Sequence, residues 1–289
     1  MPRPLPALAA LLLALGCGAS SSGPTEPQGT TPITGWEGKL TTYPLASTVQ
    51  GIGSRNVTVL VPPGYGDAAS AAIRYPVLVM HDGQNCLDHD TFGHGGWHVH
   101  TTVYDLVGRG LMAPAIVVLV DNSTTYRAQE YVPGLGAAPG PSAEGYLDFL
   151  EADVIPFVER HYRTRAGAAS RGIGGSSYGG LISLYAAWTR PATYGFAMGM
   201  STAYAYDLHA LVRATATRPP LRIYLDSGTR DYGGGDDGMA ATVALRDLLV
   251  SKGFVLGTDL MHVVGQGDTH DESYWRARLP GALPFLLPP

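Results

Sequence analysis

A glycine-rich stretch near the middle of the chain, Gly174-Gly175-Ser176-Ser177-Tyr178-Gly179-Gly180, places two serines side by side. Its segment 175–179 fits the pattern G-x-S-x-G, with Ser177 at the centre. In enzymes this pattern marks a strained turn between a strand and a helix, where small flanking residues leave the serine hydroxyl clear for nucleophilic attack. Ser176 lacks that clearance, because Tyr178 lies two residues after it. The spacing therefore predicts Ser177 as a nucleophile.

A glycine-rich turn can also bind phosphate, but the details here argue against that function. The run Gly172-x-Gly174 begins like a dinucleotide fingerprint, yet Ser177 stands where the third glycine is needed. No acidic residue follows at the distance required for a ribose contact, and the chain contains no GKS or GKT sequence. In a chain with 38 glycines the motif alone arises easily by chance, so its context must support it.

A serine nucleophile needs a histidine as base, and in enzymes with this kind of turn the histidine comes last along the chain. Of nine histidines, His270 in GDTHDESYW follows a late strand-like run, and we predict it to be the base. His262 falls inside the strand-like run LMHVV, where a structural role is expected.

The orienting acid is expected between the serine and the histidine, and Asp231 is the predicted residue because it closely follows the run RIYLDSG. Asp236 and Asp237, further along the same glycine-rich loop, remain alternatives. Asp226 lies within the run and is expected to be structural, and Asp268 is too close to His270 in sequence to be the preferred partner.

Other residues capable of chemistry have weaker patterns. Cys86 lies in the acidic sequence HDGQNCLDHD, which raises a thiol pKa and argues against a nucleophilic cysteine. Five histidines gather between residues 81 and 100, but their spacing matches no known helical ligand pair. The acidic loop around Asp231 lacks calcium-loop spacing. We predict no metal and no cofactor.

The elements that must position these residues alternate along the chain. Longer helical patterns cover 97–110, 142–162 and 239–253, and a further one follows the serine motif. Between them lie short apolar runs at 57–63, 75–82, 115–122, 171–176, 194–201, 222–228 and 260–267. Such alternation predicts an α/β fold, a mostly parallel central sheet with helices on both faces. Active-site residues of such sheets gather at the carboxyl ends of the strands.

The amino-terminal region is predicted to lie outside this fold. Residues 1–16 have an early arginine and a short apolar run, as in a secretory signal peptide. Small residues followed by Cys17 predict a lipoprotein signal in which Cys17 is acylated. Residues 17–35 are small, polar and proline-rich, as in a flexible tether, and 36–289 form the predicted catalytic domain. An ordinary signal peptide, and thus a secreted protein, is the alternative.

Composition limits the range of partners. The formal net charge is −5 and the 19 basic residues form no run, so nucleic acid is not an expected partner. A membrane contact is expected only through the lipid anchor, which would place the protein in the bacterial cell envelope.

Several stretches resemble the esterase family that includes enterochelin esterases, esterase D, feruloyl and acetylxylan esterases and mycolyltransferases. They are RNVTVLVPPGY, RYPVLVMHDGQN, AIVVLVDN with Tyr126-Arg127 and Glu130-Tyr131, YLDFLEADVIPFVERHYRT, GGSSYGGLISL, SGTRD and GDTH. The resemblance implies a single-domain α/β-hydrolase fold with no large lid. It also implies a triad of Ser177, Asp231 and His270.

The same resemblance implies an oxyanion hole made by the backbone N–H groups of Gln84 and Tyr178. Trp97 matches a family position near the cleft, although a core aromatic at a helix start is equally expected. Arg127 is expected either to touch substrate or to pair with Glu130 and brace the cleft.

These inferences together predict a serine esterase that acts on a small-molecule or polysaccharide ester through an acyl-enzyme. Carbohydrate, siderophore and simple acyl esters all fit. The alternatives are an acyltransferase with the same triad and an alcohol acceptor, or a non-catalytic binding module on an esterase scaffold.

Overall fold

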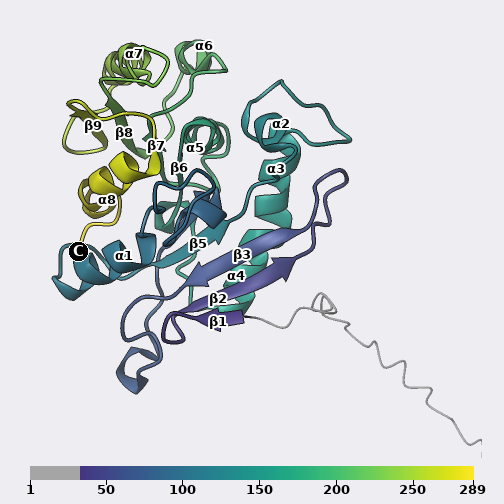
Figure 1. Cartoon of the computed structure of the whole chain (residues 1–289). Coiled ribbons are helices and arrows are strands. Elements are labelled where there is room, and N and C mark those ends of the chain that lie inside the picture. Colours follow the sequence, from purple (N-terminus) through teal and green to yellow (C-terminus); the bar gives the residue numbers. More distant parts are fainter. Residues whose placement is uncertain (1–32) are drawn as a thin grey trace, which may run out of the picture.

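The computed structural model describes residues 33–289 (Figure 1). The predicted signal peptide, Cys17 and nearly all of the predicted tether lie outside the described residues. The first strand, β1, covers Ile33–Gly35 and pairs with the next strand. The predicted start of the folded region at residue 36 is therefore three residues late.

One nine-stranded sheet runs through the described residues in the order β1-β2-β3-β5-β4-β6-β7-β8-β9. The first three strands and β5 pair antiparallel, and all pairings from β5 to β9 are parallel. The remaining strands are β2 (Leu40–Leu45), β3 (Arg55–Leu60), β4 (Val77–His81), β5 (Ile116–Val120), β6 (Arg171–Ser176), β7 (Phe196–Met200), β8 (Arg222–Gly228) and β9 (Leu260–Gly265).

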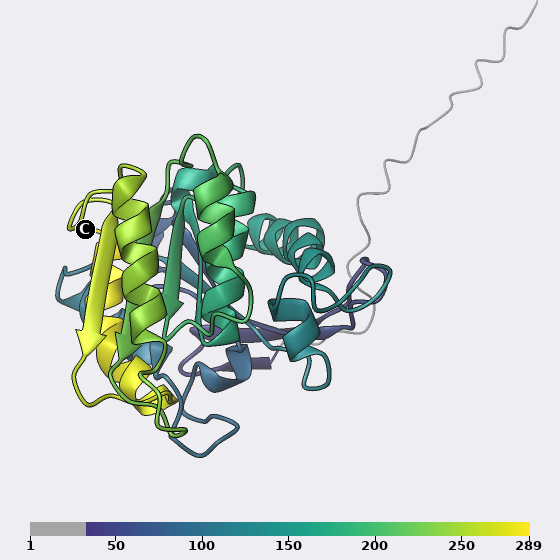
Figure 2. The ribbon, with the colours of Figure 1, turned by 90° about the horizontal axis from the view of Figure 1, so that it is seen from above.

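Helices cover both faces of this sheet, as the view from above shows (Figure 2). The α-helices are α1 (Val99–Gly108), α2 (Arg127–Tyr131), α3 (Ala143–Phe149), α4 (Ile155–His161), α5 (Tyr178–Thr189), α6 (Leu208–Ala214), α7 (Met239–Ser251) and α8 (Glu272–Leu286). Short 3-10 turns lie at η1 (Ala68–Ser70), η2 (Gly83–Asn85) and η4 (Ala168–Ser170). Between α3 and α4 lies a π-helical turn, η3 (Leu150–Val154).

Alternate residues of the central strands feed two separate hydrophobic cores. On β4, Val77 and Val79 join one core, while Leu78 and Met80 join the other. The first core lies under α3 to α7, and the second lies under α1 and α8, which pack against each other. Because both faces are buried, these strands contain almost only apolar residues.

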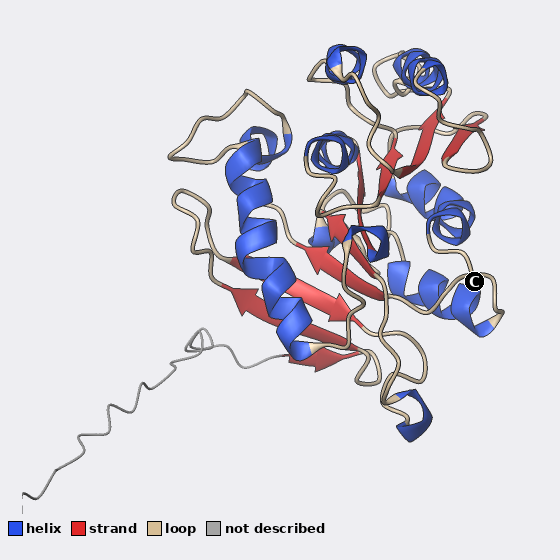
Figure 3. Cartoon of the chain, turned by 180° about the vertical axis from the view of Figure 1, so that it is seen from behind, coloured by secondary structure: helices blue, strands red, loops and turns tan. Residues whose placement is uncertain are grey.

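The seven apolar runs predicted as strands are all strands, with ends shifted by a few residues. This confirms the predicted α/β fold. The helix expected over 142–162 is interrupted by η3, because Pro156 has no N–H to continue the regular ladder. Figure 3 shows α3 and α4 nonetheless forming one long rod across the sheet. Within residues 33–289, no helix is both long enough and apolar enough to cross a membrane.

Candidate active site

The six parallel strands end at one edge of the sheet, and each is followed by a candidate residue. Asp82 and Gln84 follow β4, and Asn122 and Arg127 follow β5. Ser177 follows β6, Ser201 follows β7, Asp237 follows β8 and His270 follows β9. This placement agrees with the rule that sites of parallel sheets form where the strands end.

Ser177 occupies a strained turn between β6 and α5. Its φ of 57° and ψ of −126° lie in a region that residues other than glycine rarely adopt. The backbone on both sides holds this conformation: the Ser177 N–H donates to Met200 O at 3.0 Å, and Ser177 O accepts from Leu181 N at 3.1 Å. The side chain is half-buried, whereas Ser176 is buried at the end of β6.

The two motif glycines are needed for packing around this turn. A Cβ on Gly175 would lie 3.0 Å from the carbonyl carbon of Gly179. A Cβ on Gly179 would lie 3.1 Å from the Asp82 carboxylate, in the loop after β4. Both separations are tighter than ordinary van der Waals contact, so a side chain at either position would push the neighbouring segment away by a few tenths of an ångström.

His270 pairs with Asp237. The His270 Nδ1–H donates to Asp237 Oδ1 at 2.6 Å, and the Asp237 carboxylate is fully buried while the imidazole is partly exposed. The ring of His270 also lies edge-on to Trp275, with centroids 5.1 Å apart. With Nδ1 engaged, the other ring nitrogen, Nε2, is the one available to a nucleophile.

The prediction that Asp231 orients His270 is wrong. Asp231 is exposed, and its carboxylate accepts the Tyr232 N–H at 2.7 Å. The glycine-rich loop after β8 turns back on itself, with Gly234 N bonded to Asp231 O and Asp231 N to Gly235 O. This reversal returns Asp237, one of the two alternatives, to the strand end, where its Oδ2 accepts the Gly228 N–H at 2.5 Å.

A buried polar network binds Oδ2 of Asp237, the carboxylate oxygen that is not bonded to His270. Ser201 Oγ donates to Asp237 Oδ2 at 2.6 Å and accepts from Trp275 Nε1 at 2.9 Å and Arg278 Nη2 at 3.0 Å. Arg278 also contacts Asp226 and Asp268. Burial raises the pKa of Asp226 above its ordinary value, although the charge of Arg278 opposes this. Ser201 is thus a support for the acid, a function that the sequence did not indicate.

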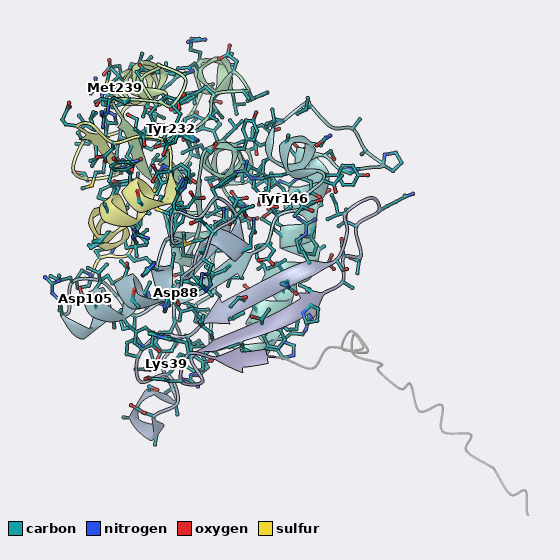
Figure 4. All side chains as sticks on the ribbon, in the orientation of Figure 1. Lys39, Asp88, Asp105, Tyr146, Tyr232 and Met239 are labelled. Atoms are coloured by element: carbon teal, nitrogen blue, oxygen red, sulfur yellow. The ribbon has the colours of Figure 1, made fainter. Side chains whose placement is uncertain are left out.

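A cavity of about 480 Å³ lies over these residues, and Ser177 and His270 both line it. Its walls include four aromatic side chains from three segments: Phe92 and Trp97 from the loop before α1, Tyr232 from the loop after β8, and Trp275 from α8. Tyr232 is labelled in Figure 4, in the loop between β8 and α7, and its hydroxyl donates to Asp271 at 2.6 Å. Asp82, Gln84, Asn122, Arg127, His94 and Glu272 contribute polar groups.

Trp97 and Arg127, the predicted substrate contacts, both line this cavity. Trp97 is also a core residue, 3% exposed, with its ring 5.6 Å from that of Trp275. Arg127 does not pair with Glu130, because Glu130 forms a buried bidentate pair with Arg55 at 2.9 Å. Arg127 instead binds Asp82 through two hydrogen bonds of 2.7 and 2.8 Å.

The predicted oxyanion residues lie in the loops after β4 and β6. Gln84 is in η2 and lines the cavity, and its side-chain Oε1 accepts the Asn122 N–H at 3.1 Å. Tyr178 is the first residue of α5, so its N–H has no partner within the helix. Both amides belong to segments adjoining Ser177 and the cavity.

The histidines between residues 81 and 100 do not converge on one point. His81 is buried and bonded to the Tyr146 hydroxyl at 2.8 Å, and burial lowers its pKa to about 3. His98 bonds to Gly95 O, and His100 lies 3.3 Å from Asp88. His94 pairs with Glu272 at 2.9 Å.

Among the described residues, one group has ligand atoms close enough for a metal ion: Asp90, His94 and Glu272, within 4.8 Å of one another. Its carboxylates already have hydrogen-bond partners. Asp90 accepts the N–H groups of Phe92 and Gly96, and Glu272 accepts from Asn85 and pairs with His94. These bonds shape the loop that forms one wall of the cavity. Cys86 is buried, and burial raises its thiol pKa well above the ordinary value.

A mostly parallel sheet with a strained serine turn and a histidine–carboxylate pair at the strand ends is typical of the α/β-hydrolase class. The chain belongs to the family described as "Putative esterase", whose model matches residues 52–286. It is a carboxylic ester hydrolase by that membership.

Solved structures share the fold. The enterobactin esterase FES from Shigella flexneri superimposes with a TM-score of 0.64 at 24% identity, over 91% of this chain but only 59% of that one. A ferulic acid esterase gives a TM-score of 0.64 at 19% identity, over 86% and 97% of the two chains. The uncharacterized protein YbbA of Bacillus subtilis (strain 168) is 22% identical over 252 residues, which cover 81% of this chain and 93% of YbbA.

Proposed function

We propose that this protein hydrolyses carboxylic esters through a triad of Ser177, His270 and Asp237. The observation that carries the proposal is the buried pairing of Asp237 with the Nδ1 of His270, in a cavity lined by both His270 and a serine in a strained turn. A buried carboxylate at Nδ1 fixes the tautomer in which Nε2 accepts a proton.

The reaction follows from these positions. Ser177 Oγ attacks the ester carbonyl carbon while His270 Nε2 takes the hydroxyl proton, and Asp237 stabilises the imidazolium that forms. His270 then gives this proton to the departing alkoxide, which leaves an acyl group on Ser177. Water attacks the acyl-enzyme with His270 again as base, and the acid is released.

The backbone amides of Gln84 and Tyr178 are proposed to bind the oxygen of the tetrahedral intermediate. Two fixed N–H donors stabilise negative charge that develops only in the transition state, and they need no reorganisation during the reaction. The placement of Gln84 beside the cavity and of Tyr178 next to the nucleophile supports this assignment.

The cavity walls support a neutral substrate with a flat face. Its charged groups are already paired, Arg127 with Asp82 and His94 with Glu272, so an added ion would have to displace a partner. Four aromatic rings line the cavity and offer stacking surfaces. Two esterases of similar fold are named for enterobactin and ferulic acid. Siderophore, carbohydrate and simple acyl esters form the substrate range to be tested.

A panel of these esters, together with a short p-nitrophenyl ester, tests the function on the folded protein. The wild type is expected to hydrolyse at least one of them, and Ser177→Ala is expected to abolish that activity without unfolding the chain. Ser176→Ala is the matched control and is expected to keep most of the activity. Full activity in Ser177→Ala would overturn the proposal.

An acyltransferase would use the same triad with an alcohol in place of water. Product analysis with glycerol or a sugar present separates the two, because transfer yields a new ester whereas hydrolysis yields only the free acid. We expect the free acid to predominate.

We also propose that the protein is exported and lipid-anchored through Cys17, on the strength of the sequence of residues 1–17. Mass spectrometry of the mature protein from its native membrane is expected to find an acylated Cys17 at the amino terminus. A mature chain that starts elsewhere and lacks acyl groups would contradict the anchor.

A further inference from the structure

Arg127 occupies a position between the two segments proposed to form the oxyanion hole. It begins α2, after β5, and its guanidinium binds both oxygens of Asp82 at 2.7 and 2.8 Å. Asp82 immediately precedes Gly83 and Gln84. The side chains of Asp82 and Arg127 are 11% and 30% exposed, so the pair is largely shielded from water. A bidentate pair of this kind fixes orientation as well as distance.

Asn122 is a second hydrogen-bond partner of the Asp82 carboxylate, and it also links this loop to Gln84. Asn122 Nδ2 donates to Asp82 Oδ1 at 2.5 Å, and Asn122 N donates to the side chain of Gln84 at 3.1 Å. The Asp82 backbone is left-handed, with φ 55°, a conformation that needs support in a residue other than glycine. A Cβ on Gly83 would lie 2.7 Å from the backbone of Leu119, so this loop is pressed against β5.

The same carboxylate lies beside the serine turn. A Cβ added at Gly179 would lie only 3.1 Å from Asp82 Oδ2, so the loop after β4 packs close to the first turn of α5. The guanidinium of Arg127 also lies 5.5 Å from the ring centroid of Tyr178, the residue after Ser177. Arg127 therefore interacts with both sides of the proposed oxyanion hole. It forms an ion pair with Asp82 on one side and a cation–π contact with the ring of Tyr178 on the other.

From this geometry, and resting on the proposed function, we propose that Arg127 is a positioning residue that sets the spacing of the Gln84 and Tyr178 amides through Asp82. Arg127 then acts on the transition state through the loop, and it need not contact the substrate. Burial acts to lower the pKa of Arg127, but hydrogen bonding to Asp82 and its charge outweigh burial and raise the pKa, so the guanidinium stays charged at all working pH values.

The first test is steady-state kinetics of Arg127→Gln on the ester that the wild type hydrolyses best. Displacing an oxyanion donor by a fraction of an ångström costs about 10–100-fold in kcat. We expect a loss in this range with KM changed by less than about threefold, since ground-state binding is not affected. Arg109→Gln, which removes an exposed arginine paired with Asp105 on α1, is the matched control and should keep wild-type kinetics.

The second test distinguishes positioning from direct substrate contact. In an Asp82→Asn background, Arg127→Gln should lower kcat by a further factor of less than about three, because the Arg127–Asp82 pair is already broken. If Arg127 touched the substrate directly, Arg127→Gln would lower kcat by the same factor whether residue 82 is Asp or Asn. That result would overturn the proposal. Arg127→Lys keeps the charge but loses the bidentate geometry, so its kcat is expected between those of the wild type and Arg127→Gln.

A third measurement reports the oxyanion hole itself. The inhibition constant of a boronic acid, which forms a tetrahedral adduct on the serine, should rise in parallel with the loss of kcat in Arg127→Gln. An unchanged constant, or wild-type kcat in a folded Arg127→Gln variant, would refute the positioning function. If the wild type hydrolyses no ester and reacts with no fluorophosphonate, the proposed esterase function has failed instead, so the two failures are distinguishable.

Discussion

The buried carboxylate of Asp237 accepts the Nδ1–H of His270 at 2.6 Å, across a loop in which Asp231 lies exposed only six residues earlier. The chain returns to the strand end after a glycine-rich reversal, and the Gly228 N–H and the Ser201 hydroxyl complete the environment of the acid. Burial and three hydrogen bonds distinguish Asp237 from every other aspartate of this loop.

If Asp237 is the acid of the triad, two substitutions in the same loop should have very different effects on kcat. Asp237→Asn should lower kcat by about 10⁴-fold, because an amide no longer holds the tautomer of His270 that accepts the serine proton. Asp231→Asn should stay within about twofold of wild type, since an exposed side chain contributes little. Steady-state hydrolysis of a p-nitrophenyl ester measures both, and the reverse pattern would reinstate Asp231.

We predict that Ser201 stabilises the fold and holds the Asp237 carboxylate in place, and that it is not a nucleophile. Ser201→Ala removes the donor to Asp237 and the acceptor of Trp275 and Arg278. We expect the free energy of unfolding to fall by about 1.5–3 kcal/mol and kcat by about tenfold. Urea denaturation and ester hydrolysis check the two numbers. Complete loss of activity in a folded variant would show that Ser201 does more than support Asp237.

The Arg55–Glu130 pair predicts a stability effect at a distance from the cavity. Both side chains are almost fully buried, and Arg55 also lies over the ring of Tyr146, which Figure 4 labels. Glu130→Ala leaves a buried guanidinium without its carboxylate and should cost about 3–5 kcal/mol in the free energy of unfolding. Urea denaturation measures it. A loss below about 1 kcal/mol would mean that Arg55 finds water or another partner.

The His94–Glu272 pair predicts a pH-dependent contribution to stability. The hydrogen bond to Glu272 raises the pKa of His94 above 6.5, with Asp271 and Asp90 adding to it and burial opposing it. A raised pKa in the folded state stabilises the protein fully below pH 6.5, and this stabilisation disappears as the pH rises through the folded-state value. The difference in urea midpoint between wild type and His94→Asn should therefore shrink as the pH rises from about 6 to 9. A difference that grows over this range contradicts the pairing.

The sequence predicted the parallel core of the fold well, because buried parallel strands read as uninterrupted apolar runs. It missed β1 and β2, which form an antiparallel edge with mixed composition, such as LTTYPL in β2. It also missed α8, whose interior contains Pro280 and Pro284 and so violates the usual helix pattern.

Within the site, local motifs were informative where the chemistry is local. Gly175 and Gly179 mark the serine turn because steric clearance is needed within five residues of chain. The choice among Asp231, Asp236 and Asp237 depends on how a glycine-rich loop folds back, which single-sequence patterns do not encode. The function of Ser201 depends on Trp275 and Arg278, more than seventy residues away, and the position of Arg127 depends on Asp82 in another loop.

Mapping the site of a fluorophosphonate adduct on the intact protein by mass spectrometry tests directly whether Ser177 is the nucleophile. We expect one adduct per chain, on Ser177, which is retained in Ser176→Ala and Ser201→Ala and lost in Ser177→Ala. An adduct on Ser176 or Ser201, or undiminished labelling of Ser177→Ala, would contradict this expectation.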